Sequence, residues 1–201
     1  FVVALDGKSC YNRGNAIVLE MDLSRIFLLF SGKRRGDPTN AKENTMKIGV
    51  IGHNYTHGAD FVMDYPDGPG CYLFLLVKTP ARLLLNGKKL HLEKNTILFF
   101  TPHAACRCEA ENGVYTDDWF YCNMTPEEEI ALRNEGMPFD TPVQTQNAAE
   151  LSELIRKMAY EHYSAELMHS EIEHQYANIL LMKIRREYSA GDHHSTLQLK
   201  D

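Results

Sequence analysis

The stretch CYLFLLVKTPARLLLNGKKLHLEKNTILFFTPH, residues 71–103, decides the fold of this chain. It consists of short apolar runs, rich in branched and aromatic residues, that alternate with turn sequences such as Thr79-Pro80 and Asn86-Gly87. Asn-Gly tolerates positive φ at both positions and therefore predicts a two-residue hairpin. Runs of about five residues with turns this close leave no room for crossover helices, so we expect antiparallel strands.

The predicted strands of this stretch are Cys71–Val77, Ala81–Leu85, Lys89–Leu92 and Thr96–Phe100. A further strand, Trp119–Met124, is expected after the polar loop Glu109–Asp118. One or two strands are expected between Lys47 and Asp64, around a polar turn at His53–Gly58. Many short strands with this spacing predict a small β-barrel or a double-sheet sandwich.

Length and charge bound the class of protein. A chain of 201 residues holds one good-sized domain, or one domain with an appendage, and 44% hydrophobic residues can form a substantial core. A net charge of −6 argues against a chain that mainly coats phosphates. No apolar run approaches the ~20 residues of a membrane span, and Ile17–Phe30 is interrupted by charges and lacks a cleavage pattern. We expect no membrane association.

The cysteine pattern points to free thiols. The chain has an odd number of cysteines, namely Cys10, Cys71, Cys106, Cys108 and Cys122. On a strand, Cys106 and Cys108 would direct both thiols to one face, but a zinc site needs two further ligands at workable spacing, and none is evident. We therefore expect buried or half-buried free thiols, and reduced cysteines fit a cytoplasmic protein.

The N-terminal part differs from the rest. Residues 1–45 end in Ser31–Asn44, a polar, basic and breaker-rich segment with the composition of a linker, and Met46 then opens a segment that reads like a domain start. Residues 1–45 are either a structured extension or a non-native or misassigned stretch. Composition favours the second interpretation.

Helices are predicted after the strands. Thr125 is an expected N-cap, followed by Pro126 at the first helical position and by Glu128 in a capping box. Asn147 is expected to cap a second helix, and a third is predicted from about Ser170 to Tyr188. We expect Gly191 to end the third helix and residues 191–201 to be the start of a linker.

No catalytic or metal motif is apparent. A metal-binding cupin needs a closely spaced His pair, a carboxylate and a later His that converge on one ion, and the spacing of His53 and His57 does not fit. There is no Gly-x-Ser-x-Gly elbow and no recognisable Cys–His arrangement. Asp117-Asp118 reads as a charged turn before a strand more readily than as a catalytic carboxylate pair. We expect no enzyme activity, no cofactor and no metal.

Four aromatic residues suggest a binding surface: Tyr65, Tyr72, Trp119 and Tyr121. Side chains alternate along a strand, so Trp119 and Tyr121 should share one face. A barrel interior lined by amphipathic rings suits a small polar-apolar ligand such as a sugar. The alternative is that these rings only fill a packed core, and the sequence leaves both open.

The order of motifs resembles the regulatory half of AraC-type transcription factors. The likeness rests on four segments between Met46 and Tyr188: YPDGPGCY, CYLFLLVKTPARLLLNG, KNTILFFTP and TDDWFYCNM. The resemblance implies an α+β protein. Its expected parts are an antiparallel cupin-like β-barrel (jelly roll) over residues 46–124, a helical dimerisation hairpin over 125–190, and a linker to a missing DNA-binding helix-turn-helix domain.

The resemblance also implies site residues. Trp119 matches the residue that stacks on the sugar in the arabinose regulator, whereas the arginine that clamps the sugar is replaced by Tyr65 here, which makes arabinose itself doubtful. Cys106 and Cys108 stand where His and Tyr are usual. The residues expected to bind the effector are Trp119, Tyr65, Tyr121, Tyr72 and Cys108.

The third helix is the expected dimer interface. Its middle, Ala177–Ile184, is apolar nearly all round, so one barrel cannot cover it. The expected seam, with three-four spacing, consists of Ile172, Tyr176, Ile179 and Lys183. Between Thr125 and His174 there are eleven acidic and three basic residues, the reverse of what a DNA-binding pair of helices would carry.

The leading interpretation is therefore an effector-sensing and dimerising domain of a transcription regulator, which reaches DNA only through the missing domain. One alternative is a small cupin enzyme that acts on a sugar or another small metabolite. A second is a ligand-free interaction module that uses the barrel only as a scaffold for a dimer.

Overall fold

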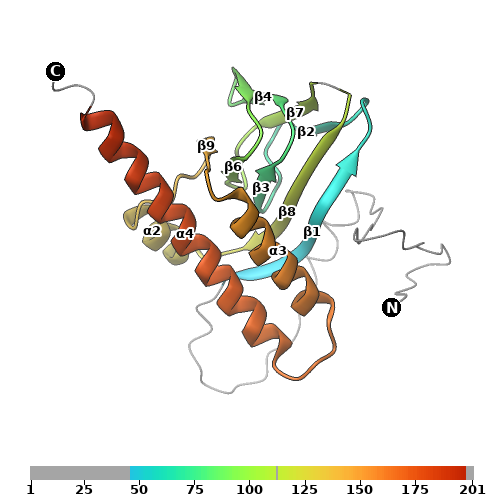
Figure 1. The fold of residues 1–201 in the computed structure, drawn as a ribbon, viewed down its shortest axis with the longest axis vertical. Coiled ribbons are helices and arrows are strands. Elements are labelled where there is room, and N and C mark those ends of the chain that lie inside the picture. The colour runs from blue at the N-terminus through green and yellow to red at the C-terminus, as the bar shows by residue number, and fades with distance from the viewer. Residues whose placement is uncertain (1–45, 112, 198–201) are drawn as a thin grey trace.

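The computed structural model describes residues 46–111 and 113–197, with side chains described up to Ser189. A β-domain occupies one end of the molecule, and two long helices lie across one of its faces (Figure 1). Residues 1–45, with Cys10 among them, lie outside the described residues, so the expectations for that stretch remain predictions. The strands are β1 (Lys47–His57), β2 (Val62–Tyr65), β3 (Tyr72–Val77), β4 (Ala81–Leu85), β5 (Lys88–Leu92), β6 (Thr96–Phe100), β7 (Cys106–Ala110), β8 (Tyr115–Asn123) and β9 (Val143–Gln144). The helices are α2 (Pro126–Asn134), α3 (Ala148–Tyr163) and α4 (His169–Leu197).

The strands form two antiparallel sheets. One has the order β1-β8-β3-β6-β9, and the other has the order β2-β7-β4-β5. Alternation of consecutive strands between two facing sheets is the arrangement of a jelly roll. The expected α+β class, with an antiparallel jelly roll followed by helices, is confirmed.

The strands predicted within residues 71–103 are all present, with ends that differ by at most one residue. Asn86 and Gly87 have φ of 48° and 79°, as a two-residue hairpin with a primed turn requires. This turn sets the register of β4 and β5, in which Leu85 faces Lys88.

The expected turn at His53–Gly58 is wrong. β1 continues to His57, where its last residues pair with the first part of β8, and the chain turns only at Gly58. Likewise β8 begins at Tyr115, so Asp117 and Asp118 lie within a strand and not in a charged turn. Both predictions took a run of polar residues as evidence of a turn. Polar residues can also occupy a strand when its pairing partner lies far away in the sequence.

The sheet that contains β3 is buried on both faces. Leu73, Leu75 and Val77 point into the jelly-roll interior, whereas Phe74 and Leu76 point to the core beneath the helices. All six residues of β3 are therefore buried, which explains why this strand reads as a continuous apolar run.

Two of the predicted helix starts differ in their chemistry. The Thr125 hydroxyl accepts a hydrogen bond from the Glu128 backbone N–H (3.2 Å), and the Glu128 carboxylate accepts one from the Thr125 N–H (2.7 Å), so the capping box is confirmed. Asn147 precedes α3, but its side chain makes no capping hydrogen bond. Its Nδ2 donates instead to Glu187 of α4.

The expected end of the third helix is wrong. α4 runs through Gly191 to Leu197. A glycine inside a helix costs only about 1 kcal/mol relative to alanine, which is too little to end a helix by itself. No helix within residues 46–111 and 113–197 combines the length and the apolar composition that a membrane crossing requires.

Candidate functional site

The inner face of β8 carries the polar and aromatic groups of the jelly-roll interior. Tyr115, Trp119 and Tyr121 belong to the interior core or pack on it, whereas Phe120 and Cys122 belong to the core beneath the helices. Trp119 and Tyr121 thus share one face, with ring centroids 5.6 Å apart. The alternation of a strand places Asp117 on this face as well.

The indole of Trp119 lies directly over Gly52 of β1, its cross-strand partner. A Cβ atom at Gly52 would come within 2.5 Å of the indole Cε2 and Nε1 atoms. Any larger residue at position 52 would displace the ring. Gly52 therefore sets where the indole can lie.

Tyr65 connects the two sheets. Its hydroxyl lies 2.7 Å from the hydroxyl of Tyr121, so a hydrogen bond joins β2 to β8 across the interior. Burial raises the pKa of Tyr65. Tyr65, Trp119 and Tyr121, all predicted to contact an effector, lie together in the structure.

Tyr72 does not lie with them. It belongs to the core beneath the helices, and its hydroxyl donates a hydrogen bond to Glu129 of α2. Burial, assisted by this hydrogen bond, raises the pKa of Tyr72. Tyr72 and Leu73 are adjacent on β3 and therefore point to opposite faces of the sheet, with Leu73 facing the interior. The sequence of the neighbouring turn did not indicate which of the two would point inward.

The thiols of Cys106 and Cys108 both point into the interior and are buried. Burial raises the pKa of each to about 12, so both are neutral thiols at physiological pH. Cys71 and Cys122 are also buried and free, as predicted. Within residues 46–111 and 113–197, His, Cys, Asp and Glu side chains form no group of three that could hold a metal ion.

The sequence interpretation missed the interior role of Asp117. This side chain is 3% exposed, and burial raises its pKa to about 8. It lies between Tyr55 of β1 and Val77 of β3 in the sheet. The spacing Asp117-x-Trp119-x-Tyr121 would have placed Asp117 on the inner face if the predicted strand had begun before Trp119.

Asp118 points to the opposite face and binds the other elements together. Its Oδ1 accepts hydrogen bonds from the Lys78 ammonium and from the Asn54 N–H, each at 2.6 Å. The Lys78 ammonium also donates to Ser152 of α3 (2.8 Å), and His53 lies 3.1 Å from that same hydroxyl. Burial lowers the pKa of His53. The two neighbouring aspartates are therefore no carboxylate pair.

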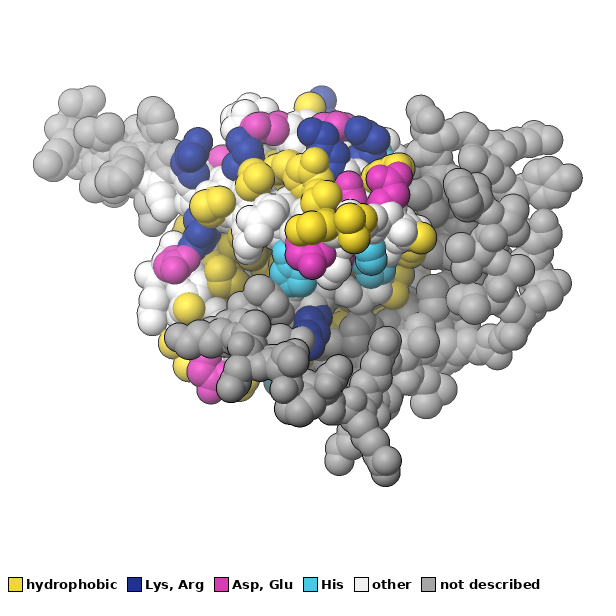
Figure 2. Space-filling view, turned by 90° about the horizontal axis from the view of Figure 1, so that it is seen from below, with side chains coloured by type: hydrophobic (Ala, Val, Ile, Leu, Met, Phe, Trp, Pro, Cys, Tyr) yellow, Lys and Arg dark blue, Asp and Glu magenta, His cyan; other side chains and the backbone are white. Residues whose placement is uncertain are grey.

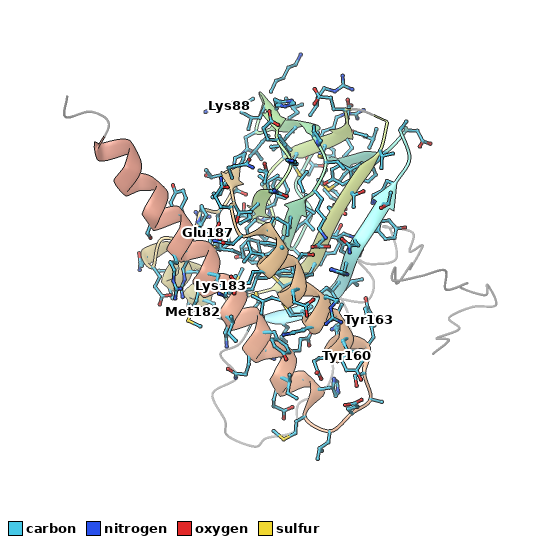
Figure 3. The ribbon with its side chains drawn as sticks, in the orientation of Figure 1. Lys88, Tyr160, Tyr163, Met182, Lys183 and Glu187 are labelled. Atoms are coloured by element: carbon cyan, nitrogen blue, oxygen red, sulfur yellow. The ribbon has the colours of Figure 1, made fainter. Side chains whose placement is uncertain are left out.

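The residues of the expected dimer seam divide into two sets. Ile172 and Ile179 are 37% and 36% exposed. Tyr176 packs under the ammonium of Lys157, and Lys183 forms an ion pair with Glu150 at 2.6 Å, so these two face α3 of the same chain. Met182, 49% exposed, lies on the side of α4 that points away from α3 (Figure 3).

Comparisons with known proteins identify similar structures only. No protein-family model and no curated protein matches the chain. Among solved structures, the chain is similar to ToxT from Vibrio cholerae O395 bound to (E)-4-(8-methylnaphthalen-1-yl)but-3-enoic acid, with a TM-score of 0.44, 6% identity, and coverage of 72% of this chain and 58% of that one. A second ToxT structure from Vibrio cholerae gives a TM-score of 0.41, 8% identity, and coverage of 72% and 57%.

A cupin protein from Bacteroides fragilis is similar with a TM-score of 0.28, 12% identity, and coverage of 47% of this chain and 88% of that one. The chain spans less than two thirds of the length of the ToxT chains that it matches.

Proposed function

We propose that this chain is the effector-binding and dimerising part of an AraC-type transcription regulator. The observation that carries the proposal is the pairing of two features in one molecule. The jelly-roll interior contains buried aromatic and polar groups around Trp119, and the helix α4 carries an apolar stripe that the other described residues leave partly exposed.

The interior suits binding better than catalysis. Its cysteines are neutral thiols, and the buried Asp117 and Asp118 face opposite sides of β8, so no activated nucleophile or carboxylate pair is formed among the described residues. This favours a sensor over the alternative of a small cupin enzyme. We propose that the effector, for which a sugar is one candidate, contacts Trp119, Tyr65 and Tyr121, with Cys108 in the same interior.

The exposed stripe on α4 has the spacing of a helix-helix seam. Ile172, Gln175, Ile179 and Met182 follow one another at intervals of three, four and three residues. Such spacing aligns side chains for packing against a second helix. The seam proposed from the structure thus keeps Ile172 and Ile179 and replaces Tyr176 and Lys183, which contact α3.

The charges on α4 suit an antiparallel pair. In a two-fold arrangement centred near Ile179, the end that carries the exposed Arg186 would lie beside the end of a second copy that carries the exposed Glu171. Hydrophobic side chains also gather at the end of the molecule where α3 passes into α4 (Figure 2). The exposed side chains there include Tyr160, Leu167 and Met168, which would extend the contact beyond the helix itself.

Sedimentation of the double variant Ile172→Glu/Ile179→Glu tests the dimer. Burying an isoleucine contributes about 1.5–3 kcal/mol, so two charges at a self-complementary seam should convert a dimer into a folded monomer. Leu84→Glu is the matched control, because Leu84 is equally exposed at 37% but lies on β4 in the other sheet. We expect this control to remain dimeric. A monomeric wild type at micromolar concentration, or a dimeric double variant, would contradict the assignment of α4 as the interface.

The remaining properties follow from this proposal. Contact with DNA would be made by a separate domain, and the free thiols fit a reducing compartment such as the cytoplasm.

A further inference from the structure

The interior of the jelly roll contains a carboxyl group with one oxygen that the described residues leave unpaired. The Oδ1 atom of Asp117 is buried without a partner in hydrogen-bond geometry. The buried hydroxyl of Tyr115, two residues away on the same face of β8, also lacks a partner in that geometry, although it lies close enough to Asp117 and Cys108 to lower the pKa of both. Buried polar atoms are nearly always hydrogen-bonded, since an unpaired one has lost its hydrogen bonds to water without replacement. Two such atoms on one face indicate a position that a ligand or water completes.

No cation of the described chain compensates Asp117 in the interior. Lys78 is the only cation among the described residues whose charge affects the pKa of Asp117. Lys78, which acts on Asp117 only from a distance, forms its ion pair with Asp118 on the opposite face. Burial lowers the pKa of His57, so this neighbour is neutral at pH 7. The other titratable groups near Asp117 are Tyr55, Tyr115, Tyr121 and Cys108 in the interior, and Asp118 on the opposite face.

Aromatic rings surround the carboxyl group. Phe61 stacks on Tyr115 with centroids 4.4 Å apart, and His57 lies 4.0 Å from Phe61. Tyr55, the cross-strand neighbour of Asp117, lies 6.3 Å from Trp119. Tyr55, His57, Phe61 and Trp119 are each partly exposed, so this group of rings beside the buried acid reaches the surface. Ring faces attract cations, most strongly where water is excluded.

We propose that the jelly-roll interior binds an organic molecule with a primary ammonium group, which donates hydrogen bonds to Asp117 while its apolar body packs among Trp119, Tyr55 and Phe61. This inference rests on the proposed function as an effector-binding domain and names the chemical class of the effector. An anionic ligand would meet no cation here. A sugar would need several polar partners, whereas the interior offers few beside Asp117 and the tyrosine hydroxyls.

Binding of such a ligand moves one proton. Burial raises the pKa of Asp117 to about 8, so the carboxyl group of the unliganded protein is mostly protonated at pH 7. On binding, the Asp117 carboxyl group releases its proton to solvent, and the carboxylate pairs with the ammonium group of the ligand. Affinity for an ammonium ligand should therefore rise with pH up to about pH 8 and then level off.

The experiment uses phenethylammonium chloride as the probe and 2-phenylethanol as its uncharged counterpart. Trp119 is the single tryptophan, so its fluorescence reports on the interior directly. We expect saturable quenching by phenethylammonium with an affinity at least about tenfold higher than that of 2-phenylethanol, because one charge-assisted hydrogen bond in a buried site contributes that much. Asp117→Asn should bring the affinities of the two compounds together. Asp67→Asn, the same substitution at an exposed position, should behave as wild type.

The outcomes separate this inference from the proposed function. Equal affinity for the two compounds in the wild type, no saturable binding of phenethylammonium, or undiminished binding by a folded Asp117→Asn variant would overturn the ammonium assignment. Saturable quenching by a neutral sugar such as arabinose, together with no response to phenethylammonium, would refute the inference while supporting an effector site. The dimer test on α4 is independent of all these outcomes.

Discussion

Asp117 and Asp118 are neighbours in the sequence and both are buried, yet only Asp118 has a cation beside it. Asp118 accepts hydrogen bonds from Lys78 and Asn54, whereas Asp117 faces the apolar interior without a cation. The difference arises because successive residues of a strand point to opposite faces, and the two faces of this sheet meet different layers. One carboxyl group is therefore paired, and the other is held neutral by burial.

The pH dependence of stability follows from Asp117. Its pKa in the folded protein, about 8, lies above the value near 4 of an unfolded chain, so its contribution to stability is full below pH 4 and is lost as the pH rises towards 8. In this window the free energy of unfolding of the wild type should fall, relative to Asp117→Asn, by at most about 1.4 kcal/mol per pH unit. Urea denaturation at several pH values measures it. Parallel profiles for the wild type and Asp117→Asn would contradict the burial of a neutral acid, whereas Asp67→Asn should follow the wild type.

At the scale of elements, the Lys78–Asp118 pair joins the sheet to α3. The ammonium contacts the Asp118 carboxylate from β8, the Asn54 side chain from β1 and the Ser152 hydroxyl from α3. The Asp118 side chain is fully buried, whereas 20% of the Lys78 side chain is exposed. This network lies where the jelly roll meets the first helix of the α3–α4 pair, so it fixes the position of α3 on the sheet.

Removing one partner of this pair should cost more than removing both. Lys78→Met leaves a buried carboxylate without its cation, which typically costs about 3–5 kcal/mol, and partial exposure of Lys78 places the expected loss at the lower end. Lys78→Met/Asp118→Asn should regain part of that loss. Arg82→Met, which breaks the exposed Arg82–Glu109 pair, is the control and should cost less than about 1 kcal/mol. Denaturant titrations of the wild type and the three variants measure the differences in the free energy of unfolding. Equal losses in Lys78→Met and Arg82→Met would show that the Lys78–Asp118 pair contributes no more than a surface pair.

At the scale of the whole molecule, the two cores share one sheet. Leu73 and Leu75 of β3 belong to the interior core, and Phe74 of the same strand belongs to the core that α3 and α4 cover (Figure 1). The loss of either core exposes the sheet that supports the other. The jelly roll and the helices should therefore unfold as one cooperative unit.

Leu180→Ala tests this cooperativity. Leu180 of α4 is fully buried in the core beneath the helices, and truncation of such a leucine typically costs about 2–5 kcal/mol. Trp119 fluorescence, which reports on the interior, and far-ultraviolet circular dichroism, which reports mainly on the helices, should shift to the same lower midpoint. Ile130→Ala, at a position on α2 that is 58% exposed and outside the proposed seam, should leave that midpoint nearly unchanged. Non-coincident transitions of the two probes would show that the helices and the jelly roll are separate folding units.

The sequence by itself determined the features whose causes are local. Asn86-Gly87 fixed a hairpin because both residues adopt positive φ, and Thr125 with Glu128 fixed a helix start because each side chain satisfies a backbone N–H of the same turn. Short apolar runs between such turns were enough to predict antiparallel strands, and the capping signals after them predicted the helices that follow. The inward pair Trp119 and Tyr121 followed from alternation along one strand.

Only the tertiary structure decided which face each remaining residue occupies. Tyr72 points to the helices, and Asp117 lies within the sheet because β1 extends far enough to pair with it. The ring of Tyr176 packs against the ammonium group of Lys157 of α3. α4 passes through Gly191 although the local sequence favours a stop. These outcomes depend on partners that are distant in the sequence. The local sequence pattern indicates whether a residue can lie in a strand or a helix. The layer that packs against that strand or helix determines whether the side chain contacts solvent, a hydrophobic core or another charged group.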